Sequence, residues 1–212
     1  MTVSAPIPQL QLRPGSVVAI PGIDWQEFEE ILQALGEKRS TRLAYSQGTL
    51  EIVAPLPKHE RAIVVIADLV KLLLRKQKRP WESLRSTTFK QQGFAGIEPD
   101  DCFYIQNYRA VIGKDRLDLA IDPPPDLAIE SDLTSKTEID AYLAIRVPEL
   151  WVYGNDQLRI QLLQNNGYVE SSISPTFPSV SIVDLVPKTI DRAREIGISE
   201  ALLEVEAGLI DG

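Results

Sequence analysis

Pro125-Asp126-Leu127-Ala128-Ile129-Glu130-Ser131-Asp132 is the part of this sequence that points most directly to a fold. Side chains alternate across a β-strand, so the even-numbered residues from Asp126 to Asp132 are expected on one face, with Leu127 and Ile129 on the other. A strand within a parallel sheet is normally apolar on both faces. Carboxylates on one face of this strand therefore call for an explanation.

The residues that follow complete a βαβ unit. A helix is expected over residues 135–145, capped by Thr134 or Ser135, and Pro148 precedes a further strand over residues 149–153. Strand, helix and strand at this spacing predict two parallel strands joined by a right-handed crossover. The sequence is therefore expected to adopt an α/β fold.

Other segments show further strand and helix patterns. Asp24 can cap a helix that ends near Gly36, and Gln47-Gly48 can form the turn of a hairpin. Residues 106–125 are irregular and charged, which is typical of a loop. The remaining expected elements are strands over 42–45, 49–53, 83–89, 100–105, 158–163 and 168–172, and a long helix over 58–78.

The length of 212 residues suits one domain that can bury a core without disulfides. Residues 1–22 contain several prolines and are expected to form an extended N-terminal arm. Residues 23–186 would form the main domain. Residues 187–212 are expected to form a helical extension, broken near Gly197.

Several classes of protein are excluded by composition. Cys102 is the only cysteine and His59 the only histidine, so there is no disulfide framework and no zinc site of cysteine and histidine. The longest apolar stretch, from Ile63 to Leu74, is too short to span a bilayer. The N-terminus lacks the features of a signal peptide, so we expect a cytoplasmic protein with no membrane contact.

The net charge of −8 limits the way in which the protein could bind nucleic acid. Non-specific attraction to DNA depends on lysine and arginine, so this charge argues against a protein that merely coats DNA. A local basic groove remains compatible with it.

Two features predict a homodimer. The helix from Ile63 to Leu74 is apolar around most of its circumference and needs to be covered, either centrally or at a dimer interface. The strands predicted near residues 158–172 also present a sheet edge that needs protection.

Carboxylates gather at three places in strand or helix-start contexts. One is Glu98-Pro99-Asp100-Asp101, at the beginning of a predicted strand. The second is the stretch from Asp126 to Asp132. The third is His59-Glu60, at the start of the long helix.

The order of Glu60, Pro99-Asp100 and Glu130-Ser131-Asp132 resembles the PD-(D/E)xK nuclease superfamily. The sequence is most similar to the bacterial Uma family, whose members are classed as restriction endonucleases. The resemblance spans roughly residues 25–168. Its motifs are the hairpin Arg42 to Leu50, the helix entry Pro57-Lys58-His59-Glu60, the stretch Pro125 to Glu130, Tyr142 and Val147-Pro148-Glu149-Leu150-Trp151.

This resemblance implies a restriction-endonuclease-like fold, with a mixed central sheet flanked by helices. It also implies that Asp100 and Glu130 hold Mg²⁺ or Mn²⁺, assisted by the backbone carbonyl after Glu130, and that Glu60 completes the shell directly or through water. Hard divalent cations take oxygen ligands and can activate water for hydrolysis of a phosphodiester. DNA would be the substrate.

The sequence departs from the family pattern at the lysine expected two residues after the glutamate. Position 132 is Asp, which could bind a second metal ion or orient water but cannot donate as lysine does. Lys136 is the candidate to supply the ammonium group from a displaced position. The segment between Glu130 and Tyr142 is shorter than usual, and Arg146 replaces a common glycine.

Some of these residues also have structural interpretations. Asp132 could cap the helix that begins near Ser135, Glu60 could stabilise a helix dipole, and Lys136 could be an ordinary solvated lysine. Asp100 could simply begin a strand. Glu130 has the strongest functional case, because an unpaired carboxylate within a buried strand is costly.

Three functions follow from these alternatives. The first is a metal-dependent endonuclease with Glu60, Asp100, Glu130 and Lys136 as catalytic residues and Asp132 as a further metal ligand. The second is a catalytically silent nuclease fold that binds nucleic acid or serves in assembly. The third is an enzyme that uses the same metal cluster on another substrate.

Overall fold

The computed structural model describes residues 7, 11–36, 39–133, 135–165 and 167–208. Within these ranges the strands form two sheets. The antiparallel sheet has the order β1 (Val17–Pro21), β3 (Thr49–Val53), β2 (Arg42–Ser46), β6 (Ala95–Ile97) and β5 (Phe89–Gln91). The mixed sheet has the order β11 (Gly167–Ser171), β10 (Gln157–Gln164), β9 (Glu149–Gly154), β8 (Leu127–Ser131), β7 (Asp101–Tyr104) and β4 (Glu82–Ser83).

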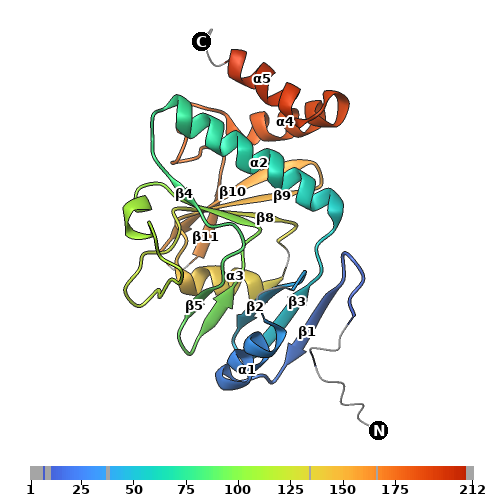
Figure 1. Ribbon diagram of the computed structural model, residues 1–212, viewed down its shortest axis with the longest axis vertical. Coiled ribbons are helices and arrows are strands. Elements are labelled where there is room, and N and C mark those ends of the chain that lie inside the picture. The colour runs from blue at the N-terminus through green and yellow to red at the C-terminus, as the bar shows by residue number, and fades with distance from the viewer. Residues whose placement is uncertain (1–6, 8–10, 37–38, 134, 166, 209–212) are drawn as a thin grey trace.

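Helices separate and cover these sheets. Figure 1 shows α2 on one face of the mixed sheet and α3 on the other, where α3 also lies against the antiparallel sheet. α1 covers the far face of the antiparallel sheet. The helices are α1 (Trp25–Leu35), α2 (Pro57–Lys76), α3 (Lys136–Ile145), α4 (Ile182–Ile196) and α5 (Ile198–Gly208).

The predicted βαβ unit is confirmed as β8, α3 and β9. β8 and β9 are parallel and in register from the Leu127 and Glu149 pair to the Ser131 and Tyr153 pair. Ser135 caps α3, because its side chain accepts a hydrogen bond from Glu138 N; the alternative cap, Thr134, lies outside the described residues. A mixed sheet flanked by helices is the fold class that the sequence predicted.

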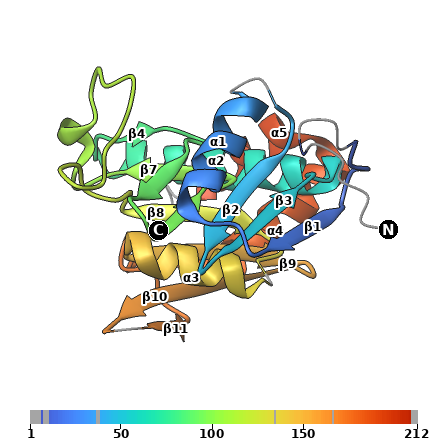
Figure 2. The same cartoon turned by 90° about the horizontal axis from the view of Figure 1, so that it is seen from below.

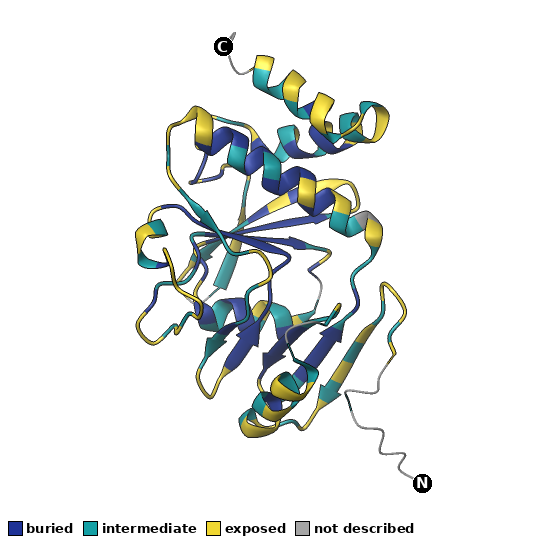
Figure 3. Cartoon of the chain, viewed as in Figure 1, coloured by how far each residue is buried: buried dark blue, intermediate teal, exposed yellow. Residues whose placement is uncertain are grey.

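Side-chain alternation along β8 is also as predicted. Leu127 and Ile129 pack in the core beneath α2. Ala128 lies in the second core, which joins α3 to both sheets. Glu130, two residues on, therefore faces α3. Figure 3 shows β8 and β9 buried along most of their length.

The antiparallel sheet divides its side chains in the same way. Leu43 and Tyr45 of β2 pack in the core beneath α1, whereas Ala44 belongs to the core shared with α3. Arg42 shares the face of Ala44, and Glu51 of β3 is on the face opposite to the buried Leu50 and Ile52. Charged side chains from both sheets are thus directed toward the layer that contains α3.

Some boundaries differ from the predictions. The single strand expected over residues 83–89 is wrong, since β4 belongs to the mixed sheet and β5 to the antiparallel sheet. β6 was not predicted, because three residues give too little pattern. Residues 17–21, assigned to an extended arm, pair with β3 as β1. α4 begins at Ile182, before the predicted helical extension, and so contains Pro187. The helix tolerates the backbone hydrogen bond that proline removes, because its apolar face is buried in the core.

The long helix predicted over residues 58–78 is α2. α4 and α5 of the same chain pack on it, so its apolar surface does not itself require a second copy. The homodimer remains a prediction, which light scattering would test. The irregular segment over residues 106–125 is confirmed apart from a short 3₁₀ helix, Tyr108–Ala110, and projects to one side (Figure 2). None of the helices in the described ranges is long and apolar enough to cross a membrane.

The seating of α1 on the antiparallel sheet depends on Gly96 of β6. A Cβ atom there would lie 2.7 Å from Cζ of Phe28, whose buried ring stacks on Tyr45 at 4.7 Å between centroids. Gly96→Ala should therefore reduce the free energy of unfolding by about 1–3 kcal/mol through overpacking. Gly167→Ala is the matched control, since nothing lies within 4 Å of the added methyl group. Urea unfolding measures both, and equal stabilities would contradict this packing.

Candidate active site

A cavity of about 390 Å³ lies where β2, β8, the start of α2 and the start of α3 meet. Its wall combines apolar residues with charged ones, and several of the charged side chains are buried. The charged and ionisable lining residues are Arg42, His59, Glu98, Asp100, Glu130, Asp132 and Glu138.

Asp100 immediately precedes β7, and only 7% of the residue is exposed. Its Oδ2 accepts hydrogen bonds from Ser131 N at 2.9 Å and from Ser131 Oγ at 2.6 Å. Its Oδ1 accepts one from Arg42 Nε at 2.7 Å. Because Asp101 pairs with Ile129 in the sheet, the backbone itself places Asp100 beside the end of β8.

Glu130 lies on the same cavity wall and is 6% exposed. Tyr142 of α3 donates a hydrogen bond from its hydroxyl group to Glu130 Oε1. Burial raises the pKa of Glu130 well above its ordinary value, and the charges of Asp100 and Glu138 raise it further, whereas Tyr142 and Arg42 act in the opposite direction. The structure thus brings Asp100 and Glu130 together, as the sequence predicted.

Glu60 is not in the cavity wall. It lies in the first turn of α2, and its side chain is 41% exposed. Arg42 Nη2 donates to Glu60 Oε1 at 3.0 Å, so Glu60 is connected to Asp100 through a shared guanidinium group. Its position is compatible with a supporting role at the edge of the site.

Asp132 lines the cavity at its rim, with 43% of its side chain exposed. It does not cap α3, a position that Ser135 holds. His59 Nε2 lies 3.0 Å from Asp132 Oδ2, and the backbone of Asp132 has a φ of 54°. Gly154 has no Cβ to collide with this side chain, since a Cβ there would lie 2.3 Å from Asp132 Oδ1.

Lys136 is the first residue of α3 and is exposed. It is absent from the residues that line the cavity in the described part of the chain. The structure therefore does not bring Lys136 to Asp100 and Glu130, and its catalytic role stays a prediction.

Glu138 is a cavity residue that the sequence analysis missed. Burial raises its pKa to about 7, and the charges of Glu51 and Asp100 add to this, while hydrogen bonds with Ser135 oppose it. In the sequence, Ser135-Lys-Thr-Glu138 has the spacing of a helix capping box, which gives Glu138 a purely structural explanation. Arg42 was also missed as a site residue, although it begins a strand in the family hairpin.

The remaining predicted carboxylates have structural roles. Glu98 accepts hydrogen bonds from Arg39 and Thr88 and from the backbone of Leu43. Asp126 accepts bonds from the backbone of residues 105–107 and so fixes the start of the loop.

The cavity is lined by more carboxyl groups than cationic groups. Asp100, Glu130 and Glu138 share it, and Arg42 is the cation bonded to Asp100. Nearby, Glu51 is 7% exposed and its Oε2 has no hydrogen-bond partner among the described residues. Oxygen donors with surplus negative charge fit the chemistry of a hard divalent cation.

The present arrangement does not yet form a coordination shell. In the described ranges, no three His, Cys, Asp or Glu side chains stand close enough together to hold a metal ion. Both oxygens of Asp100 are already engaged, one of them by Arg42. The residues therefore fit a cation in type and charge, provided that Arg42 can release Asp100.

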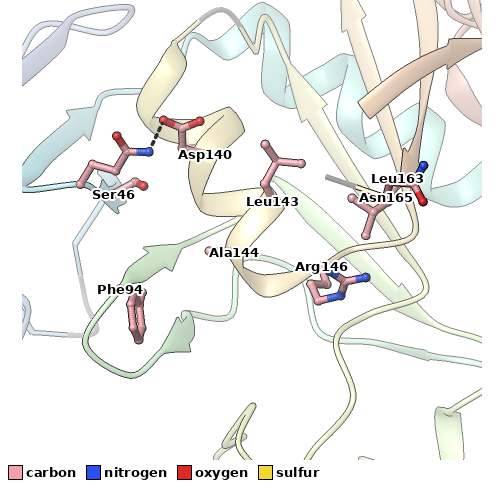
Figure 4. Close-up of a pocket in the computed structure, with 9 residues that line it drawn as sticks. Ser46, Phe94, Asp140, Leu143, Ala144, Arg146, Leu163 and Asn165 are labelled. Carbon is pink, nitrogen blue, oxygen red and sulfur yellow. Dashed lines mark hydrogen bonds between the residues drawn. The ribbon is translucent and has the colours of Figure 1, made fainter. Parts of the chain in front are cut away.

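A second hollow, of about 360 Å³, lies at the other end of α3. Figure 4 shows Phe94 and Arg146 at its edge and Leu143 between them, with Asp140 accepting a hydrogen bond from Gln47 at 3.0 Å. Among the described residues of this lining, Asp140 is the only carboxylate, and it is engaged by Gln47. This hollow contains none of the predicted site residues.

A mixed sheet that presents an aspartate and a glutamate from neighbouring strands to one acidic cavity defines a protein of the restriction-endonuclease-like class. The family model of Uma2, described as "Putative restriction endonuclease", matches residues 25–195. The chain belongs to this family.

One solved structure supports the fold independently. It is a "putative nuclease belonging to DUF820" from Anabaena variabilis ATCC 29413, 15% identical in sequence, with a TM-score of 0.53. The match covers 79% of this chain and 98% of that one. No curated protein matches the sequence.

The high pKa of Glu138 predicts a specific dependence of stability on pH. Its pKa rises from 4.5 to about 7 on folding, so ionisation destabilises the folded protein progressively as pH increases between these values. Glu138→Gln removes this cost and, without metal, should raise the free energy of unfolding at pH 8 by up to about 3 kcal/mol.

Urea unfolding in the presence of EDTA, at pH 5 and at pH 8, measures this effect. Glu200→Gln is the control, because Glu200 also lies in the first turn of a helix but is exposed. A Glu138→Gln variant that is no more stable than the wild type at pH 8 would refute the buried charge.

Proposed function

We propose that the protein is an endonuclease that hydrolyses phosphodiester bonds of DNA with the help of Mg²⁺ or Mn²⁺. The observation that carries this proposal is the meeting of Asp100 and Glu130 in one cavity, at the ends of adjacent strands. Membership of the Uma2 family supports a nuclease-like function. A surplus of buried carboxylates supports a cationic partner.

Asp100 and Glu130 are the residues proposed to hold the metal ion, with Glu60 and Asp132 completing its shell directly or through water. When bound, such an ion supplies Lewis acidity that activates water and offsets the charge of the phosphate. Ser131 orients Asp100 through two hydrogen bonds, and Tyr142 orients Glu130. These contacts hold the two carboxylates in place before any ligand enters.

Lys136 is the proposed source of an ammonium group for the attacking water. It is adjacent to Ser135, which lines the cavity, and a lysine side chain is long and flexible. Exposure at the helix start leaves it free to reorient.

A catalytically silent protein is the second candidate. It is favoured by the Asp at position 132 and by the absence of Lys136 from the cavity wall in the described residues. Such a protein would keep the fold for nucleic-acid binding or assembly, and the two candidates differ in whether DNA is cut.

Cleavage of supercoiled and single-stranded DNA with Mg²⁺ or Mn²⁺ tests the proposal. Asp100→Asn and Glu130→Gln should each reduce the rate by about 100-fold or more, since a lost metal ligand removes several kcal/mol of stabilisation. Lys136→Ala in the same assay tests the proposed ammonium group.

Asp126→Asn is the matched control. Asp126 immediately precedes β8, the strand of Glu130, but among the described residues its side chain bonds to the loop backbone and to Asn107 and not to the cavity residues. Its cleavage rate should stay close to that of the wild type. Circular dichroism checks that each variant is folded. Full activity of Asp100→Asn or Glu130→Gln would refute the assignment, and no cleavage by the folded wild type would favour the silent protein.

A further inference from the structure

Arg42 is bonded to two of the carboxylates proposed to hold the metal ion. Its Nε donates to Asp100 Oδ1 at 2.7 Å, and its Nη2 donates to Glu60 Oε1 at 3.0 Å. One guanidinium group thus bridges β2, the start of β7 and the first turn of α2. The contact between Arg42 and Asp100 lies in the wall of the cavity in which the metal ion is proposed to bind.

The surroundings of Arg42 make it the main counter-ion of this site. Its side chain is 19% exposed and lines the cavity. Burial acts to lower the pKa of Arg42, but the carboxylates of Asp100, Glu60 and Glu130 raise it overall. The other two cationic or ionisable nitrogen groups nearby are engaged elsewhere, His59 with Asp132 and Arg39 with Glu98.

The hydrogen bonds of Asp100 put Arg42 in competition with a metal ion. Oδ2 of Asp100 is held by Ser131, through the backbone and the hydroxyl group, which leaves Oδ1 as the oxygen for a further partner. Arg42 Nε occupies that oxygen. A divalent cation on Oδ1 would also repel the guanidinium group at short range. Metal bound at Asp100 would therefore weaken the contact between Arg42 and this carboxylate and favour release of the guanidinium group.

We propose that Arg42 is a phosphate-binding residue, an inference that rests on the proposed function. While no metal is present, Arg42 holds Asp100 and Glu60 in place. Once a metal ion has displaced Arg42 from Asp100, its guanidinium group binds the substrate phosphate. The planar guanidinium group offers several donors in a geometry that matches phosphate oxygens. Arg42 is the first residue of β2 and its backbone pairs with Val53 of β3, so only the side chain has to move.

Arg39 is a structural arginine next to the cavity wall. It is bonded to Glu98, another residue of the cavity wall, and to the backbone oxygen of Gly36. Glu98 also accepts from Leu43 N and so fixes the local backbone rather than a proposed metal ligand. Arg39→Met is therefore a matched control for Arg42→Met.

Two binding measurements test this role without cleavage activity. Isothermal titration with Mn²⁺ alone compares the metal affinity of the wild type, Arg42→Met and Arg39→Met. Fluorescence anisotropy with a labelled oligonucleotide in Ca²⁺ compares their affinity for phosphodiesters. Arg42→Met should bind Mn²⁺ about tenfold more tightly, because the charged hydrogen bond that competes for Asp100 is gone. It should bind the oligonucleotide about tenfold more weakly, because the charged hydrogen bond to phosphate is gone. Arg39→Met should match the wild type in both.

Arg42→Lys is a second variant, which keeps the test usable if Arg42→Met does not fold. It retains the positive charge beside Asp100. It should bind Mn²⁺ with an affinity near that of the wild type and the oligonucleotide more weakly, because lysine lacks the planar donor pair. Unchanged Mn²⁺ affinity in folded Arg42→Met, or unchanged oligonucleotide affinity in both Arg42 variants, would overturn the inference alone. No Mn²⁺ binding by any of the proteins would overturn the proposed metal site as well.

Discussion

The carboxylate of Asp100 accepts hydrogen bonds from both sheets of the molecule. Ser131 of the mixed sheet holds one oxygen, and Arg42 of the antiparallel sheet holds the other. Arg42 extends this connection to α2 through Glu60. The position of the cavity depends on this point, because the layers that form its walls are joined here by charged hydrogen bonds, which are stronger than neutral ones. The apolar cores fix the layers, and the hydrogen bonds of Asp100 join them at the site while no metal is bound.

The acidic character of the cavity has a cost in stability. Glu130 is buried and Glu138 half-buried close to Asp100. Burial raises the pKa of both glutamates, and the neighbouring carboxylates raise it further. A fold selected only for stability would replace such residues with apolar ones. Uncompensated carboxylates aimed at one cavity are instead typical of sites that bind a cation or move protons. The carboxyl groups that line this cavity therefore lie where the proposed chemistry needs oxygen ligands.

The sequence predicted much of the fold and the centre of the site. The alternation around Glu130 and the βαβ spacing are local patterns, so β8, α3 and β9 could be read directly. Arg42 could not be assigned, since its partners are 58 and 18 residues away and only the tertiary structure brings them together. Glu138 was hidden by a capping pattern that explains it locally. β6 is too short for a periodicity, and Gly96 within it serves the packing of Phe28.

The central claim is that Asp100 and Glu130 bind a divalent cation in place of Arg42. A crystal structure of the protein soaked in Mn²⁺, with anomalous diffraction recorded at the manganese edge, tests this most directly. We predict an anomalous peak between the two carboxylates, with the Arg42 side chain turned away from Asp100. A peak elsewhere, or no peak with Arg42 still bonded to Asp100 at saturating Mn²⁺, would contradict it.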